Sequence, residues 1–454
     1  MSSLSQHITR YQPFSGKTIA LGICGGIAAY RACDLIRELY RQGAARVICL
    51  MTQSAEAFIP ALTLEALSAQ PVYRYNASVV TQENSSQSGL PVHIQLAQEA
   101  DLLLVMPATV NTIAKMACGL ADDLLTTTFM TFTNKPVLLA PAMNHRMWDH
   151  PLFQDNLKRL LALPNVSLVS PVAGLLACGE IGEGHLASQQ SILHHAYRLL
   201  HPYAQCLEGV KILVTAGGTR EPIDPVRCLS NYSSGKMGLA LADEAWAMGA
   251  EVTLLSSQPE LQRPYDIHGF STIRDLQAVL EAQWPLHDWL LMAAAVSDFR
   301  PSQVAAQKMK KYPHPEGEIL PSQTLVLEAN PDLLASLSLA KQPYQRLVGF
   351  AAESEDLLHH AKTKLARKNL DAIVANDISQ PGIGFASDEN EVTLITASGC
   401  LKAIEKAPKP VVARKILHCL HEEFAMGSSV SEQSLIPRNG LGQALTACLR
   451  GTGS

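Results

Sequence analysis

The stretch Lys17-Thr-Ile-Ala-Leu-Gly-Ile-Cys-Gly-Gly-Ile-Ala-Ala-Tyr30 joins a β-rich run, a turn with two glycines and the start of an amphipathic helical pattern. The same order of features returns in Val210–Met248. Strands that alternate with helices build a parallel sheet with helices on its faces. The sequence therefore predicts an α/β protein with two domains, each a mainly parallel sheet covered by helices on both faces.

Apolar segments of strand length continue this pattern, with helical segments between them. In the first half they are Arg46–Met51, Asp101–Met106, Lys135–Ala140 and Val166–Val169. In the second half they are Glu251–Ser256, Trp289–Ala294, Arg346–Ala351, Asp371–Ala375 and Glu391–Ile395.

The chain has 454 residues, more than one hydrophobic core usually supports. The Pro-containing segment His201–Glu208 follows a helical pattern and precedes a strand, which favours a domain boundary there. We expect a first domain over residues 1–204 and a second over 205–426. Residues 427–454 are polar and rich in Gly and Ser, so we expect a disordered tail.

Composition narrows the class of protein. The formal net charge is -5, so no broad basic surface is expected, and binding to nucleic acid or to a membrane is disfavoured. Met1–Gly16 lacks the apolar core of a signal peptide and no segment has ~20 successive apolar residues, which predicts a cytoplasmic protein. Ten cysteines without a Cys-x-x-Cys motif indicate neither a zinc site nor a disulfide framework. Small-molecule substrates fit best.

Two turns look suited to anions. The first, around Gly25 and Gly26, departs from the Gly-x-Gly-x-x-Gly fingerprint because Cys24 and Ile27 occupy two glycine positions, which disfavours a standard dinucleotide site. From the residues alone, a tight turn without any ligand explains it equally well.

The second turn resembles the end of a P-loop but lacks two of its residues. Ser230 stands where the first glycine belongs, and Met237 replaces the hydroxyl residue that would bind magnesium. Its small polar groups and one cation suit an anionic ligand, although a plain helix cap would use the same residue types. These groups are Asn231, Ser233, Ser234, Gly235 and Lys236.

Short motifs then occur in order along the first half: Gly25-Gly-Ile-Ala-Ala-Tyr30, His93-Ile94, Pro107-Ala-Thr-Val-Asn-Thr112, Pro141-Ala-Met-Asn-His-Arg-Met147 and Ala177-Cys-Gly-Glu-Ile-Gly-Glu-Gly184. With them this half resembles the homo-oligomeric, flavin-containing cysteine decarboxylases. The resemblance implies a flavodoxin-like or Rossmann-like fold that binds FMN.

The second half carries Thr215-Ala-Gly-Gly-Thr-Arg-Glu-Pro-Ile-Asp-Pro-Val-Arg227, Ser230-Asn-Tyr-Ser-Ser-Gly-Lys-Met-Gly238, Ala293-Ala-Ala-Val-Ser-Asp-Phe299, Lys308-Met-Lys-Lys311, Asn330-Pro-Asp332, Gly349-Phe-Ala-Ala-Glu353 and Ala375-Asn-Asp377. It resembles the CTP-using phosphopantothenoylcysteine synthetases, which implies a Rossmann-like, CTP-binding ligase domain. Together the halves resemble the bifunctional phosphopantothenoylcysteine decarboxylases and phosphopantothenate–cysteine ligases of coenzyme A biosynthesis.

The resemblance implies roles in the decarboxylase half, where transient oxidation of the substrate thiol by FMN supplies the electron sink for loss of CO2. His93 is the implied base or orienting group, Asn144 holds the carboxylate, Cys178 donates a proton, and Met147 positions the substrate. Without the motif, His93 would be a hydrogen-bonded structural histidine about half the time. For Asn144, the alternative is a residue that only caps a helix. Implied FMN contacts are Gly25, Gly26, Ile27, Ala28, Thr52, Ala108, Thr109 and Asn111.

The ligase half is implied to attack the α-phosphate of CTP with the substrate carboxylate, giving an acyl-cytidylate that the amine of cysteine then opens. Asn231 stabilises this intermediate, and Asp298 holds Mg²⁺ or the ribose. Phe350 with the backbone of Ala293, Ala294, Ala295 and Val296 flanks the base. Further implied nucleotide contacts are Lys308, Lys364, Lys368, Pro331, Asp332, Leu333 and Leu334.

The implied small molecules are phosphopantothenate, L-cysteine and CTP, and the implied assembly is a homo-oligomer built on trimers of the flavoprotein domain. Two alternatives stay open. Relatives of the decarboxylase fold bind and inhibit phosphatases, so a regulatory flavoprotein is one. The other is a chain with one inactive site, because His185 stands where the family usually has arginine.

Overall fold

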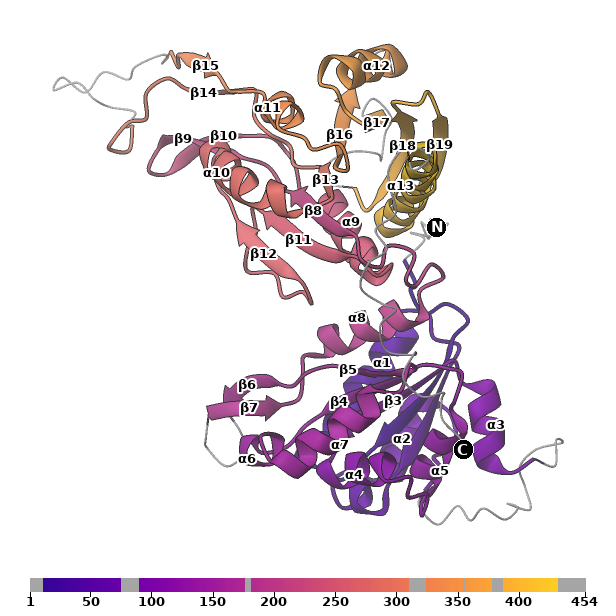
Figure 1. The fold of residues 1–454 in the computed structure, drawn as a ribbon. Helices are drawn as coiled ribbons and strands as arrows, with labels where there is room; N and C mark the ends of the chain where they lie inside the picture. Colours follow the sequence, from indigo (N-terminus) through magenta and orange to yellow (C-terminus); the bar gives the residue numbers. More distant parts are fainter. Residues whose placement is uncertain are drawn as a thin grey trace, which may run out of the picture.

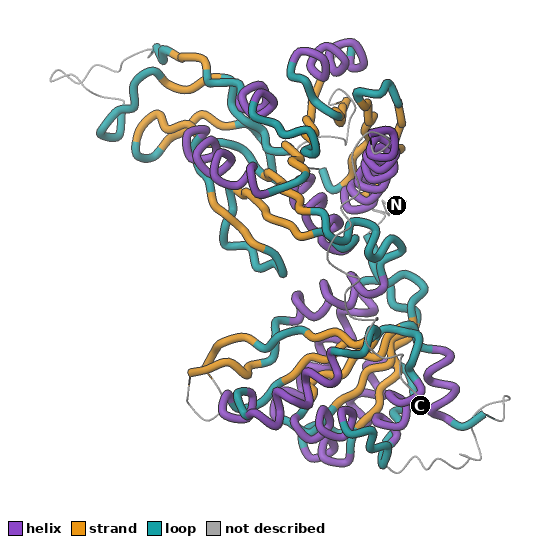
Figure 2. Tube along the Cα trace, viewed as in Figure 1, coloured by secondary structure: helices purple, strands orange, loops and turns teal. Residues whose placement is uncertain are grey.

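The computed structural model describes residues 11–74, 90–175, 181–309, 324–353, 356–377 and 387–431 (Figure 1). Two α/β bodies meet at a narrow junction. The N-terminal body runs from indigo to magenta and the C-terminal body from pink to yellow, and Figure 2 shows strands flanked by helices in both. Within the described part of the chain, no helix is long and apolar enough to cross a membrane.

The N-terminal domain holds a five-stranded parallel sheet in the order β2-β1-β3-β4-β5. Its strands are β1 (Thr18–Ile23), β2 (Arg46–Met51), β3 (Leu102–Ala108), β4 (Val137–Pro141) and β5 (Val166–Leu168). Because both faces of the sheet are covered, the strands are apolar almost throughout instead of alternating.

Helices from opposite faces pack into two separate apolar clusters of this domain. One cluster takes in α1 (Ala32–Arg41), α2 (Ala61–Ser68) and α8 (Gln189–Leu200). The other takes in α3 (Val92–Glu99), α4 (Val110–Ala117), α5 (Leu124–Thr131) and α7 (Pro151–Leu161). Short elements complete the domain: η1 (Ile27–Arg31), η2 (Gln53–Ala57), α6 (His145–Trp148) and the antiparallel pair β6 (Val172–Leu175) and β7 (Ile181–His185).

The C-terminal domain is built on an eight-stranded sheet in the order β12-β11-β8-β13-β16-β17-β18-β19. Six neighbouring strands are parallel: β12 (Asp266–Gly269), β11 (Glu251–Ser256), β8 (Lys211–Ala216), β13 (Trp289–Met292), β16 (Arg346–Glu353) and β17 (Ala372–Asp377). Two antiparallel strands close one edge: β18 (Glu389–Thr396) and β19 (Leu401–Pro408).

Helices cover both faces of the larger sheet as well. One apolar cluster includes α9 (Lys236–Ala247) and α13 (Lys409–Ser431), and the other includes α10 (Ile273–Gln283), α11 (Leu333–Leu339) and α12 (Leu357–Arg367). The remaining elements are η3 (Trp284–Leu286), the hairpin β9 (Arg220–Asp224) and β10 (Arg227–Ser230), and the pair β14 (Phe299–Pro301) and β15 (Leu327–Ala329). The predicted α/β class with two mainly parallel sheets is confirmed.

The junction between the domains is held by polar contacts around one buried carboxylate, Glu244 of α9. It accepts hydrogen bonds from the hydroxyls of Tyr11 and Tyr197, at 2.7 and 2.9 Å, and pairs with Arg414 Nε of α13 at 3.0 Å. The ring Nε2 of His201 lies 3.1 Å from the same carboxylate. This cluster therefore ties both ends of the N-terminal domain to two helices of the C-terminal domain.

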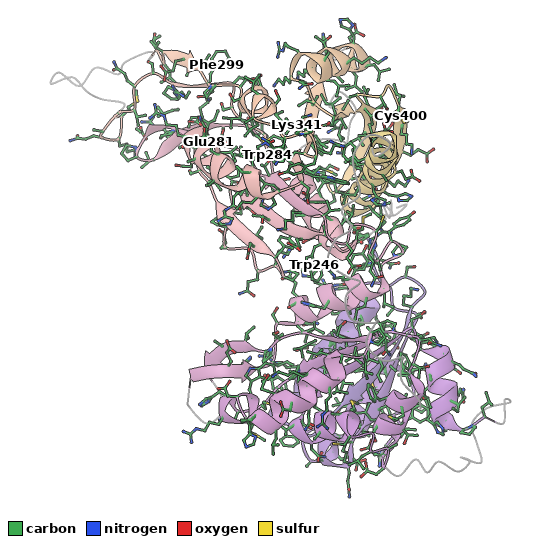
Figure 3. All side chains as sticks on the ribbon, in the orientation of Figure 1. Trp246, Glu281, Trp284, Phe299, Lys341 and Cys400 are labelled. Carbon is green, nitrogen blue, oxygen red and sulfur yellow. The ribbon has the colours of Figure 1, made fainter. Side chains whose placement is uncertain are left out.

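A second contact at the junction joins α8 to the end of α9. Arg198 donates to the carbonyls of Trp246 and Gly249, at 2.7 and 3.2 Å, and its guanidinium lies 4.6 Å from the centre of the Trp246 ring. Figure 3 shows Trp246 where the two domains approach each other. The contacts satisfy carbonyls at the end of α9 that have no partner within the helix.

Candidate active sites

The C-terminal domain contains a pocket of about 640 Å³. Pockets of this size commonly hold a small molecule or cofactor. Residues before α9, after β13, around the start of α11, in β16 and on α12 line it, so it opens beside the carboxyl ends of parallel strands, where ligands bind in such sheets.

Two loops at these strand ends support each other. Ala295 N donates to Gly217 O at 2.8 Å, and the hydroxyl of Thr219 accepts from Ser297 N at 3.0 Å. The side chain of Asn231 donates to Val296 O at 3.3 Å. The loop after β8 therefore fixes the loop after β13, and Asn231 is held against the backbone that lines the pocket.

Glycine is required where α9 begins. Gly235 has a positive φ of 73°, and a Cβ there would lie 3.1 Å from Gly217 N. A Cβ on Gly238 would lie 2.6 Å from Thr215 O. The first turn of α9 consequently sits directly on the end of β8, with its N-terminus at the pocket wall. The positive end of the helix dipole at such a place favours an anion.

Cations dominate the charged groups of the pocket wall: Lys236, Lys364, Arg367, Lys368 and Lys409, against Asp298 and Asp332. Asp332 caps α11 by accepting from Ala335 N, and Lys368 Nζ lies 3.0 Å from its carboxylate. Burial opposes ionisation of Asp332, but these hydrogen bonds and the nearby charge of Lys368 outweigh it and lower the pKa. The pocket is therefore suited to a strongly anionic ligand.

Nearly all the ligase residues singled out from the sequence meet at this pocket. They are Asn231, Ala293, Ala294, Ala295, Val296, Asp298, Pro331, Asp332, Leu333, Leu334, Phe350, Lys364 and Lys368. Lys308 is the exception: it is exposed, outside this lining, and its neighbour Met309 bonds to Asp224. Sequence reasoning quoted Asn330 and Asn376 within motifs but gave them no role, and it missed Arg367, Asn390 and Lys409. Asn330 and Arg367 are adjacent in sequence to the predicted residues Pro331 and Lys368, so their positions could have indicated that they also line the pocket.

In the N-terminal domain, three loops at the carboxyl ends of β1, β2 and β3 converge. Thr52 N donates to Ile23 O at 3.1 Å, and a Cβ on Gly25 would lie 2.4 to 2.6 Å from atoms of Ser54. A Cβ on Gly26 would lie 3.8 Å from Thr109, which caps α4. Gly25, Gly26, Thr52 and Thr109 therefore belong to one cradle, and Ile27, Ala28, Ala108 and Asn111 directly flank it.

Asn144 lies after β4 and caps α6 by accepting from Arg146 N at 2.9 Å. The β6–β7 hairpin is fastened beside it, because Met143 N donates to Gly184 O at 2.9 Å and a Cβ on Gly184 would lie 2.2 Å from Met143 O. Cys178, between the two strands, lies outside the described residues. Met147 on α6 is 49 % exposed, and His185 ends β7 with its Nδ1 3.0 Å from Leu186 O.

His93 does not join Asn144 within one chain. Its helix, α3, is tied to edge strand β2 by the Arg46–Glu99 ion pair at 2.8 Å, whereas Asn144 follows β4, next to the opposite edge strand. Figure 1 draws α3 and α6 toward opposite ends of the sheet. Among the residues that the structure describes, the buried Nδ1 of His93 has no hydrogen-bond partner. A single chain thus holds two separate parts of the predicted decarboxylase site.

The fold and the C-terminal pocket together define a two-domain α/β protein whose second domain carries a pocket lined by cations. Comparison with known proteins agrees with this division. The family model described as Flavoprotein matches residues 7–201, and the one described as DNA/pantothenate metabolism flavoprotein C-terminal domain matches residues 207–424.

Curated relatives match along most of the chain. The coenzyme A biosynthesis bifunctional protein CoaBC of Vibrio parahaemolyticus is 40% identical over 413 residues, covering 90% of this chain and 99% of the relative. Those of Bacillus subtilis strain 168 and Escherichia coli K12 are each 39% identical, covering 92% and 85% of this chain and 100% and 92% of their own. The chain belongs to the CoaBC family, and the predicted resemblance is confirmed.

Two solved structures each match about one domain of this chain. The C-terminal domain of a CoaBC protein is 33% identical, covers 49% of this chain and 99% of its own, and has a TM-score of 0.41. A cysteine-to-serine mutant of PPC decarboxylase, complexed with pantothenoylaminoethenethiol, is 29% identical, covers 41% and 98%, and has a TM-score of 0.35.

Proposed function

We propose that this chain joins phosphopantothenate to L-cysteine in its C-terminal domain and decarboxylates the product to phosphopantetheine in its N-terminal domain. Membership of the CoaBC family over nearly the whole chain carries this proposal. The C-terminal pocket supports it, because it gathers nearly all the residues singled out for the ligase reaction. The proposed domains are residues 1–204 and 205–426, with a tail over 427–454; α13 continues to Ser431, and residues 432–454 lie outside the described residues.

In the ligase reaction, the carboxylate of phosphopantothenate attacks the α-phosphate of CTP. The new bond joins the carboxylate oxygen to the α-phosphorus as a mixed anhydride with CMP, and pyrophosphate leaves with the electron pair of the broken bond between the α-phosphorus and its bridging oxygen. The amine of cysteine then attacks the acyl carbon and CMP departs. Negative charge gathers on phosphate oxygens in the first step, so Lys364 and Lys368 stabilise it. Asn231, held against Val296 O, offers its amide to the acyl-cytidylate.

Asp298 stands at the pocket wall, in the loop after β13, where its carboxylate would hold Mg²⁺, and the ion would supply positive charge to the nucleotide. Asn330 N donates to Asp298 O at 2.8 Å, which fixes the backbone of this residue beside Asp332. CTP as the nucleotide and Mg²⁺ at Asp298 are both part of the proposal. Phe350 and the Ala293–Val296 backbone flank the base. Lys308, which is exposed and outside the pocket lining, stays a proposed nucleotide contact.

The N-terminal cradle fits FMN. Gly25 and Gly26 after β1 leave room for a ligand, and Thr109 after β3 offers a hydroxyl. The starts of η1 and α4 add backbone N–H groups. Such groups suit ribityl and phosphate oxygens. When bound, FMN supplies reversible two-electron oxidation of the substrate thiol. Asn144 then holds the carboxylate that is lost as CO2, and Cys178 returns a proton.

Replacing Gly25 by Ala is expected to weaken FMN binding at least ~10-fold, because the new Cβ collides with Ser54, including its backbone carbon at 2.6 Å. The measurement is flavin absorbance per chain after gel filtration and titration of the apoprotein with FMN. The matched control is Gly174→Ala, where the nearest atom lies at 3.6 Å. Equal FMN affinity in both variants would contradict the proposed cradle.

The separation of His93 from Asn144 supports an assembly in which the decarboxylase site forms between chains. A homo-oligomer built on trimers of the flavoprotein domain would place His93 of one copy beside Asn144 of the next. We expect an equimolar mixture of His93→Ala and Asn144→Asp chains, dissociated and reassembled, to regain part of the decarboxylase activity that each has lost alone. Analytical ultracentrifugation and product formation measure this, and no recovery in mixed oligomers would contradict it.

A regulatory flavoprotein is the second candidate. It predicts flavin binding without turnover, whereas the clustering of the ligase residues in one pocket favours an enzyme. The third candidate is a chain with one inactive site. Separate assays of ligation, with phosphopantothenate and L-cysteine, and of decarboxylation, with phosphopantothenoylcysteine, distinguish it from the main proposal. A cytoplasmic location stays a prediction.

A further inference from the structure

Lys135 lies just before β4 and donates to three carbonyls at the C-terminal end of α3, the helix that carries His93. Its Nζ is 2.9 Å from Ala97 O, 2.6 Å from Gln98 O and 2.7 Å from Ala100 O. The last carbonyls of a helix have no partner within the helix, and a cation there also matches the negative end of the helix dipole. Lys135 therefore fastens the C-terminal end of α3.

The apolar packing of α3 is thin. All eight of its residues are described, and Leu96 is the one that is buried. Helices this short are marginal in isolation, so contacts with neighbouring elements decide where they lie. The Arg46–Glu99 ion pair is partly exposed, and such pairs contribute little. The position of α3 consequently depends strongly on the contacts of Lys135.

The contact at the other end of α3, where His93 is the second residue, is weaker. His93 O accepts from the hydroxyl of Thr131 at 3.3 Å. The same hydroxyl lies 2.8 Å from Thr128 O and has one proton to donate. Because these two carbonyls compete for it, the hydroxyl alone does not fix His93.

Lys135 is itself held by the central part of the domain. Its carbonyl accepts from Asn165 Nδ2 at 3.0 Å, and the carbonyl of the next residue, Pro136, accepts from Leu103 N of β3 at 3.1 Å. The ammonium group of Lys135 thus joins α3 to the buried sheet. A short helix moves as a unit, so the contact at its C-terminal end also sets where His93 lies.

We propose that Lys135 is a positioning residue of the decarboxylase site, which holds α3 against the sheet so that His93 stands at the substrate. This inference rests on the proposed decarboxylase function and on the proposed role of His93. The plain alternative is a lysine that only caps a helix. Such a cap would contribute to stability, whereas a positioning residue changes turnover through His93.

The first test is the full-length variant Lys135→Met, which keeps an unbranched apolar side chain and removes the three donors. We expect kcat/KM for phosphopantothenoylcysteine to fall about 10-fold, because a misplacement of about 1 Å lowers rates steeply. FMN absorbance per chain and the rate of the ligase reaction should stay at wild-type values, since the proposed FMN contacts and the ligase pocket lie outside α3. Lys135→Arg, which keeps a cationic donor, should restore most of the loss.

The matched control is Lys158→Met, which removes an exposed lysine from α7 of the same domain and should leave kcat/KM within twofold of wild type. A second comparison adds Lys135→Met to His93→Ala. If Lys135 acts through His93, the residual turnover of His93→Ala should fall no further in the double variant. A merely structural role would lower it again.

Mixed oligomers locate the defect within the site. Lys135→Met chains reassembled with Asn144→Asp chains should regain activity, because one chain supplies a well-placed His93 and the other an intact Asn144. Reassembled with His93→Ala chains, they should regain none. A general defect of the domain would also impair Asn144 on the Lys135→Met chain and prevent recovery with either partner.

Two results would overturn the inference: kcat/KM of Lys135→Met within twofold of wild type, or a further loss of about 10-fold in the double variant. If His93→Ala and Asn144→Asp chains do not complement each other, the site does not form between chains, and the double variant decides. If wild type itself releases no CO2 from phosphopantothenoylcysteine, the proposed decarboxylase function fails instead, so the failures are distinguishable.

Discussion

Replacing Asn144 by Asp is expected to reduce decarboxylation at least ~100-fold, the loss typical of removing one precisely placed donor. The substitution replaces the amide N–H proposed to hold the substrate carboxylate by a second negative charge. The helix should survive, because Asp also caps helices and retains the oxygen that accepts from Arg146 N. Mass spectrometry of the coupled reaction should show phosphopantothenoylcysteine accumulating while CMP forms at the wild-type rate.

Two further variants distinguish the effect of the added negative charge from the effect of losing the Asn144 amide donor. Asn144→Ser keeps a capping oxygen without adding charge, so its decarboxylation should fall less than that of Asn144→Asp. Asn156→Asp introduces the same charge on α7, outside the predicted site, and should stay close to wild type. FMN absorbance per chain checks that the domain is intact. Decarboxylation by Asn144→Asp within about threefold of wild type would contradict the proposed role.

Replacing Glu244 by Gln is expected to destabilise the C-terminal domain and its junction by about 3 kcal/mol or more, because Arg414 would keep its charge while losing the buried counter-charge. The measurement is calorimetric melting of the full chain, with small-angle scattering to follow the orientation of the domains. Glu251→Gln is the matched control: its carboxylate is 70 % exposed and 4.0 Å from Lys211, so a change below ~1 kcal/mol is expected.

The same carboxylate predicts an acid-dependent loss of stability. Burial opposes ionisation of Glu244, but the hydrogen bond from His201 and the charge of Arg414 outweigh it, so its pKa lies below the ordinary value of 4.5. A lowered pKa means that the stabilisation is complete above 4.5 and is lost as the pH falls through the lowered value. The melting temperature of wild type should fall in that range, and that of Glu244→Gln should change less. Parallel curves would show that Glu244 is not the group responsible.

Much of the fold was predictable because buried parallel strands are apolar along their whole length. Arg46–Met51 and Glu251–Ser256 match β2 and β11 residue for residue. Most strands outside the two main parallel arrays were missed, although the antiparallel strand β18 was predicted as Glu391–Ile395, and the parallel strand β12 was missed as well. β10, β15 and β19 are short or largely exposed, so their sequences carry polar residues without the run of apolar side chains that marks the core strands.

The residues of the candidate sites also fall into those that the sequence predicts and those that it does not. Asn231, Asp298 and Asp332 lie in contiguous motifs, and the topology of a parallel sheet brings the ends of its strands together. Lys409 and Glu244 lie outside those motifs, and their partners are distant in sequence: Arg414 lies 170 residues from Glu244. Such pairs depend on how the helices pack, which no local pattern records. The position of His93, away from Asn144, likewise follows from strand order and not from the motifs.

The most direct test of the whole account is to incubate the purified protein with phosphopantothenate, L-cysteine, Mg²⁺ and either CTP or ATP, and to follow the products by mass spectrometry. The account predicts phosphopantetheine, CO2, CMP and pyrophosphate with CTP, and little product with ATP. Phosphopantothenoylcysteine as the end product would mean that the N-terminal site is inactive. No product with either nucleotide would contradict the central claim.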